Sequence, residues 1–206
     1  MTDARELIPA ATDRLTVRVR AVDAAAAPEL WAAPTPCTAW SVRDLVAHLC
    51  FEHLWAPDVL AGESMDAVGD RYDGDLLADD PVGAWERAAA ASGPAFAETA
   101  AHAGRVHTIF GWIAVAEYAE QMLLDLTVHE WDLARGAGLA EDLEPGNVER
   151  ALTYARSHPV MLTGPGLFAP PVRTAGSTAR EQLLLLLGRR PSWSPVPSRT
   201  SDGPSW

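Results

Sequence analysis

The longest uninterrupted helical pattern in the chain covers residues 113–135 and is closed by Gly136 and Gly138. Glycine just after a periodic run is typical of a helix C-terminus, because it adopts left-handed backbone without a steric penalty. No alternation of apolar and polar residues is long enough to predict a sheet. The pattern therefore predicts an all-α fold, most simply a helical bundle with extra C-terminal helices. The other helical runs are residues 5–22, 41–60, 81–101, 145–156 and 177–187.

Local signals predict where some of these helices start or bend. Ser41 followed by Asp44 resembles a capping box, and Asp80 followed by Pro81 places proline at a first helical position. Pro57 is expected to bend its helix, because the ring removes an internal hydrogen bond. The segments before and between these helices, residues 28–40, 66–80 and 104–111, are expected to be connections.

The length of 206 residues suits one domain with a full hydrophobic core. We expect a single helical-bundle domain over residues 1–190, followed by a flexible Pro- and Ser-rich tail over residues 191–206. The start of the chain lacks the basic region of a secretory signal, and no apolar run reaches the roughly 18 residues of a membrane helix. Two cysteines are too few for a secreted disulfide framework. These features predict a soluble, cytoplasmic protein without a membrane partner.

Acidic residues outnumber basic ones by 28 to 16, which gives a formal net charge of −12. A nucleic-acid binder needs a basic patch to neutralise phosphates. We therefore expect no nucleic-acid partner.

The most informative candidate site lies on residues 113–135. Asp125 and His129 are four residues apart, so they share one helix face, which is otherwise apolar. His48 shares the predicted inward face of the helix over 41–60, and the three side chains can converge if the two helices pack together. Two imidazoles and one carboxylate form a three-ligand metal site with an open position. A hydrogen-bonded Asp/His pair without metal is the alternative, and the spacing leaves both open.

Several neighbouring residues have two readings. Glu52, one turn beyond His48, is a candidate general base or further ligand, or else a partly solvated carboxylate. Asp132 and Arg135 either orient the ligands and hold an anionic substrate or form a helix-end ion pair, which the sequence favours slightly. Trp112 either lines a substrate pocket or belongs to the core.

The remaining cysteines and histidines are expected to be structural. Cys37 precedes a helix N-terminus, which can lower a thiol pKa, but packing in a Pro-rich turn is favoured. Cys50 is expected in the core. The other four histidines are predicted to be surface or capping residues, and the tryptophans to be mainly core: His53, His102, His107 and His158; Trp40, Trp55, Trp85, Trp112 and Trp131.

Three separated motifs carry a family resemblance: residues 35–48 (TPCTAWSVRDLVAH), residues 110–112 (FGW) leading to Glu117-Tyr118, and residues 125–135 (DLTVHEWDLAR). In this order they resemble the DinB-like metal-binding family related to the N-terminal domain of mycothiol-dependent maleylpyruvate isomerase. The likeness extends from about residue 31 to residue 193. It is specific to the family rather than to one activity.

The resemblance implies an up-and-down four-helix bundle with a divalent metal, most simply zinc, held by His48, Asp125 and His129. The isomerase has glutamate where Asp125 stands, and the shorter acid still suits zinc. The isomerase also carries a further C-terminal domain that contributes to its active site, for which this chain is too short. Maleylpyruvate is therefore not carried over as the substrate.

The leading hypothesis is a metal-dependent S-transferase or isomerase that acts on a small molecule with a low-molecular-weight thiol, mycothiol by resemblance, as co-substrate. The alternatives are a non-catalytic module that binds metal or a small ligand, and a bundle that acts through helix contacts, for example as a homodimer. The sequence identifies neither the substrate nor the metal, since zinc, nickel and iron all suit these ligands.

Overall fold

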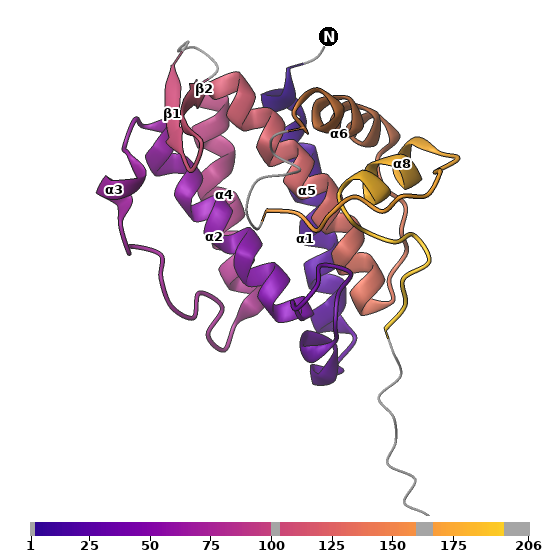
Figure 1. Cartoon of the computed structure of the whole chain (residues 1–206). Helices are drawn as coiled ribbons and strands as arrows, with labels where there is room; N and C mark the ends of the chain where they lie inside the picture. Colours follow the sequence, from indigo (N-terminus) through magenta and orange to yellow (C-terminus); the bar gives the residue numbers. More distant parts are fainter. Residues whose placement is uncertain (1–2, 100–103, 160–166, 196–206) are drawn as a thin grey trace, which may run out of the picture.

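The computed structural model describes residues 3–99, 104–159 and 167–195. Four long helices lie side by side in it (Figure 1). They confirm the predicted all-α class and the helical bundle. The four helices are α1 (Ala4–Ala24), α2 (Val42–Leu60), α4 (Pro81–Thr99) and α5 (Val115–Ala137).

The four helices form a closed ring in which α1 and α2 each contact both α4 and α5. Paired positions give their directions: Arg43, at the start of α2, donates to the Ala78 carbonyl just before α4, and His53 meets Ser92 halfway along both helices, so these two helices run parallel. Trp85, near the start of α4, donates to Thr16 in the second half of α1, so α1 and α4 run antiparallel. The long connection over 61–80 returns the chain to the end of the bundle where α2 began (Figure 1). Each of the four helices therefore runs antiparallel to the one before it in the chain, except α4, which runs parallel to α2.

The predicted helix starts are confirmed. Ser41 and Asp44 form a reciprocal capping box at the start of α2, which satisfies backbone N–H groups that have no partner within the helix. Pro57 lies inside α2, which continues to Leu60. The connections contain short helices that the sequence did not predict: η1 (Pro28–Ala32), a 3-10 helix, and α3 (Met65–Val68).

A small hairpin precedes α5, where the sequence predicted a connection over 104–111 and the first residues of a helix. Strands β1 (Arg105–Thr108) and β2 (Gly111–Ala114) pair antiparallel, with Thr108 opposite Gly111. Each strand has four residues, too few for an alternating pattern to be recognised in the sequence. Gly111 takes a φ of +82°, which glycine adopts without strain at the turn.

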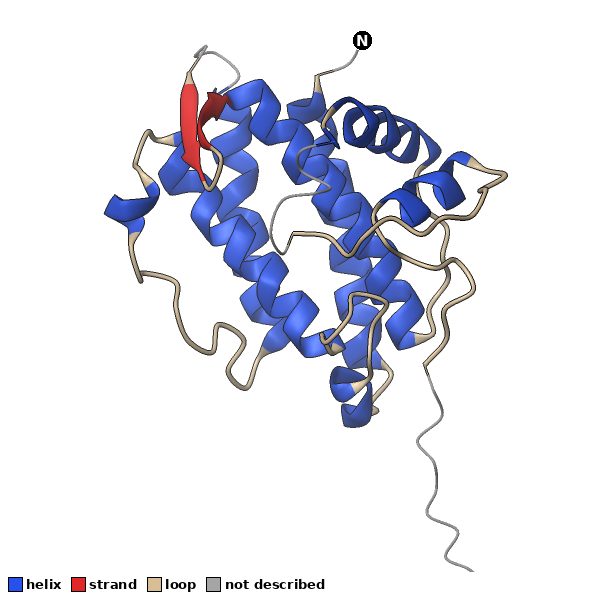
Figure 2. Ribbon diagram, in the orientation of Figure 1, coloured by secondary structure: helices blue, strands red, loops and turns tan. Residues whose placement is uncertain are grey.

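The predicted C-terminal helices are present as α6 (Pro145–Ser157) and α8 (Ala179–Leu186) (Figure 2). They pack on each other, and α6 also packs on α5. A second cluster of buried side chains lies there, so α5 is buried on two sides. That cluster includes Leu124, Val128, Trp131, Leu152 and Leu184. Residues 196–206 of the expected tail, and residues 100–101 of the expected helix, lie outside the described part of the chain. Among the described helices, none combines the length and apolar character needed to span a bilayer.

Candidate functional site

Three side chains predicted as metal ligands meet between α2 and α5. His48 Nε2 lies 3.5 Å from Asp125 Oδ2, and His129 Nε2 lies 3.2 Å from Asp125 Oδ1. One nitrogen or oxygen atom from each of the three lies within 4.8 Å of the others. The packing of α2 against α5 therefore brings together residues 77 or more positions apart.

The spacing of these atoms fits a metal ion. Two donors bound at about 2.0–2.1 Å to one tetrahedral ion lie about 3.3 Å apart, close to both separations. His48 Nε2 and Asp125 Oδ2 are buried and have no hydrogen-bond partner. Buried polar atoms without partners are costly unless something else, such as a cation, satisfies them. The residues present thus fit a divalent ion.

A series of buried polar contacts holds the His129 ring at Nδ1, the nitrogen that does not face Asp125. His129 Nδ1 lies 3.0 Å from Asp132 Oδ2, which also accepts a 2.9 Å hydrogen bond from Arg189 Nη2. Asp132 and Arg189 are almost completely buried. A carboxylate on the far nitrogen of a ligating histidine fixes the tautomer and raises the basicity of the ligating nitrogen. Asp132 is placed to do this, and Arg189 to hold Asp132.

Trp40 covers the two imidazoles from the loop before α2. Its ring centroid lies 4.8 Å from that of His48 and 5.8 Å from that of His129, and the two imidazole centroids are 5.1 Å apart. Such contacts restrict the rotamers of both histidines. The site is therefore rigid on the side that Trp40 covers.

The electrostatics of the cluster favour a positive charge between the carboxylates. Burial alone would raise the pKa of the Asp125 carboxyl, but the imidazoles of His129 and His48 hold it below its ordinary value. Burial alone would lower the pKa of His129, but Asp125 and Asp132 raise it to about 9. Without a metal, the His129 proton supplies that positive charge; a metal cation would replace it.

The cluster opens into a cavity of about 600 Å³. His48, Asp125 and His129 line it, and so does Glu52, one turn beyond His48 on α2. Burial raises the pKa of the Glu52 carboxyl above its ordinary value, although His48 acts in the opposite direction. Cavities of this size suit small organic ligands. A ligand can therefore reach the three donor side chains and Glu52 together.

One known protein family matches the part of the chain that carries this site. The model of the mycothiol maleylpyruvate isomerase N-terminal domain matches residues 8–134, well over half of the chain. The match contains all three candidate ligands. The chain belongs to this family. Comparison with curated proteins and with solved structures gives no match.

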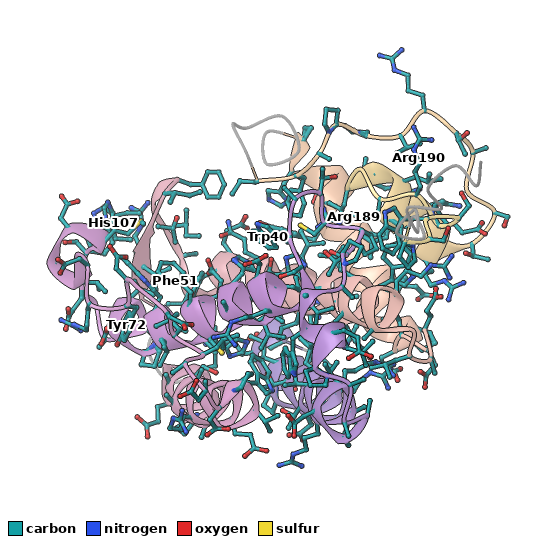
Figure 3. The ribbon with its side chains drawn as sticks, turned by 90° about the horizontal axis from the view of Figure 1, so that it is seen from below. Trp40, Phe51, Tyr72, His107, Arg189 and Arg190 are labelled. Atoms are coloured by element: carbon teal, nitrogen blue, oxygen red, sulfur yellow. The ribbon has the colours of Figure 1, made fainter. Side chains whose placement is uncertain are left out.

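Part of the site of this family member lies outside the matched range. Arg189 follows α8, and Leu167, Phe168 and Ala169 contribute to the cavity wall. Figure 3 shows Phe51, Trp40 and Arg189 following one another along one side of the helices. The C-terminal segment therefore contributes part of the wall of a site whose candidate ligands belong to the family domain.

Two candidate residues are not brought to the cluster. Trp112 lies in β2, about half exposed, with its ring beside His107 on β1. Arg135 pairs with Glu141 and donates to the carbonyls of Pro191 and Trp193. Both lie outside the cavity lining.

For Asp132 the sequence slightly favoured an ion pair at the helix end, and the structure differs. Its partners are His129 and Arg189, inside the fold, and not a neighbouring charge at the helix end.

The expectation that His53 is a surface or capping residue was wrong. It is fully buried, with Nδ1 at 2.5 Å from Ser92 Oγ and its ring 5.0 Å from that of Trp85. It faces α4, because α2 is packed on two sides. His158 does cap, since its backbone N–H closes the end of α6. His102 lies outside the described residues.

Cys50 is buried in the core, as expected, whereas Cys37 is only partly buried, with its sulfur within 4.8 Å of a His129 nitrogen and an Asp132 oxygen. Burial raises the pKa of Cys37 to about 11 and that of Cys50 to about 12, which disfavours the thiolate form of both. Cys37 also lines the cavity, as does His107, whose Nδ1 accepts from the Met65 N–H. Sequence reasoning missed both as cavity residues; for Cys37 its place within the TPCTAW motif was the available signal.

Proposed function

We propose that this protein is a metal-dependent enzyme of low-molecular-weight thiol chemistry, an S-transferase or thiol-assisted isomerase acting on a small molecule. The observation that carries the proposal is the convergence of His48, Asp125 and His129, at distances that suit one divalent ion, on the wall of a ligand-sized cavity. Zinc suits two imidazoles and a carboxylate. The family description supports mycothiol as the thiol.

The side chains have separable roles in this proposal. A divalent ion, when bound, lowers the pKa of a thiol or water at its open position. His48, Asp125 and His129 hold it, while Asp132 fixes the His129 ring. Glu52 accepts the proton that the thiol S–H releases, since its carboxyl lines the same cavity. The thiolate sulfur then bonds to the substrate carbon: in a transfer the leaving group departs with the electron pair of the bond it held, and in an isomerisation a carbon–carbon π bond opens, so that rotation can precede expulsion of the thiolate.

The alternative is a binding module without turnover, in which another side chain closes the site. Glu52 was the candidate for that role. Among the described residues, the donor group around Asp125 contains only His48, Asp125 and His129. An ion held by these three side chains would keep a position open for a ligand in the cavity, which supports the enzyme, because catalytic sites keep one position open.

Elemental analysis of protein purified without chelator tests the metal. We expect about one divalent ion per chain in the wild type, its loss in His129→Ala, and its retention in His158→Ala, a histidine outside the cavity. A His129→Ala variant with the full metal content contradicts the assignment.

A conjugation assay tests turnover. With mycothiol and 1-chloro-2,4-dinitrobenzene, the thioether and chloride form together, and we expect the rate to fall to background in His129→Ala. Wild-type protein that holds metal but gives only the background rate with mycothiol favours the binding module.

A further inference from the structure

We propose that the second substrate of this site is a neutral, mainly apolar aromatic molecule and not a dicarboxylate. That this molecule is a substrate rests on the proposed function. Its chemical class rests on the cavity alone. Three features support it: the aromatic wall, the balance of charge, and the apolar rim.

The wall of the cavity is aromatic on several sides. Six aromatic side chains line it, contributed by the loop before α2, by α2, by the hairpin turn, by α5 and by the segment after residue 166. They are Trp40, Phe51, Trp55, Phe110, Tyr118 and Phe168. Rings pack against other rings in offset or edge-on geometries that add to the gain from apolar burial. A flat aromatic ligand would therefore find favourable contacts around most of its surface.

On the described wall, no arginine is free to pair with a ligand carboxylate. Arg189 is the cationic side chain of the described lining besides the histidines, and Asp132 already pairs with it at 2.9 Å. The two imidazoles at the centre share Asp125. A divalent ion there would be balanced by Asp125 and one thiolate. Glu52 adds a further carboxyl. A ligand with two carboxylates would thus bury charge without a partner, which is costly.

The rim of the cavity is apolar as well. Ile109 and Phe110 in the hairpin turn and Leu167 on the opposite segment line it, and all three are exposed. Large exposed apolar side chains beside a pocket mark a ligand-binding surface more often than an unused one. An apolar ligand would be in contact with apolar groups from the entrance to the metal site.

Two fluorescent probes of nearly equal shape separate the ligand classes. N-phenyl-1-naphthylamine is neutral, and 1-anilinonaphthalene-8-sulfonate is the same ring system with one sulfonate. We expect the neutral probe to bind with a Kd at least about tenfold lower, because the sulfonate finds no free cation. Chelator-treated protein is used, because a divalent ion without a bound thiolate would leave a positive charge that Asp125 alone does not balance.

Three variants locate the binding. Phe51→Ala, in the wall, is expected to raise the Kd of the neutral probe about tenfold. Val17→Ala, an exposed apolar residue of α1, is the control and leaves both Kd values unchanged. Gln121→Arg places a cation in the wall. It is expected to lower the Kd of the sulfonate probe about tenfold and to change the Kd of the neutral probe little.

The outcomes distinguish this inference from the proposed function. Equal or tighter binding of the sulfonate probe by the wild type overturns the inference, and so does a Phe51→Ala variant with unchanged affinity for the neutral probe. Either result leaves the metal analysis intact. A protein that binds no metal but prefers the neutral probe refutes the proposed function and keeps the ligand class.

Discussion

Arg189 donates a buried hydrogen bond of 2.9 Å to Asp132, although the two residues are 57 positions apart in the chain. The same carboxylate oxygen of Asp132 contacts His129 Nδ1. Through this contact the segment after α8 reaches a candidate ligand on α5. The stability of the C-terminal helices and the geometry of the metal site are thereby linked.

The buried ion pair gives a prediction with a neighbouring control. Arg189→Met leaves Asp132 buried without its cation and is expected to lower the free energy of unfolding by about 3–5 kcal/mol. Arg190→Met, at the next and exposed position, should change it by no more than about 0.5 kcal/mol. Urea unfolding followed by circular dichroism measures both. Equal midpoints for the two variants would contradict the structural role given to Arg189.

A second prediction concerns the orientation of His129. Asp132→Asn keeps a hydrogen-bond acceptor but removes the charge, so zinc affinity is expected to fall about 10–100-fold. Competition with a chromophoric chelator measures the affinity, and Asp79→Asn, on an exposed residue, is the matched control.

Asp132→Asn also leaves Arg189 without its counter-ion. The double variant Asp132→Asn/Arg189→Met removes both charges and is expected to keep the low zinc affinity. Recovery of wild-type affinity in the double variant would show that Asp132 serves only to neutralise Arg189.

The parts of the site that were predictable from sequence share a local signal. Asp125 and His129 are one helical turn apart, so their common face follows from helix geometry alone. His48 was placed by the apolar residues of its own helix. The packing of α2 on α5 then brought all three together, as expected.

Arg189 could not be predicted in the same way. It stands in a Gly-Arg-Arg segment beside a Pro-rich tail, where arginines are normally solvated. Its partner is set by how α8 packs, which no short-range pattern encodes. His53 was misplaced for a related reason: one inward face was assumed for a helix that contacts α4 as well as α5.

His53 gives a prediction for the pH dependence of stability. Burial lowers its pKa from 6.5 to about 4, although the charge of Asp125 acts in the opposite direction. The unfolded chain therefore binds a proton more readily, and stability is lost as the pH falls from about 6.5 toward 4. The full loss from this residue is roughly 3 kcal/mol. Urea unfolding with a chelator present, at pH 7 and pH 5, measures it.

His53→Gln removes the titrating group, so the difference between pH 7 and pH 5 should shrink in that variant. An unchanged difference would mean that other groups dominate the acid sensitivity.

The role of Glu52 is separable from metal binding. Glu52→Gln retains the shape of the side chain but cannot accept a proton at neutral pH. We expect an unchanged metal content and a fall in the conjugation rate of about 10²–10⁴-fold. Glu52→Asp, which restores the carboxyl one methylene shorter, should recover part of the rate. A Gln variant at the wild-type rate would exclude Glu52 as the base.

The most direct test of the metal site is calorimetric titration of zinc into chelator-treated wild-type protein and His48→Ala. His48 is the decisive residue because it is the member of the three-residue donor group that lies on α2, so only the convergence of the two helices can give it a role. We predict one site per chain in the wild type and a loss of at least about 100-fold in affinity in the variant. Undiminished zinc binding by His48→Ala would contradict the account.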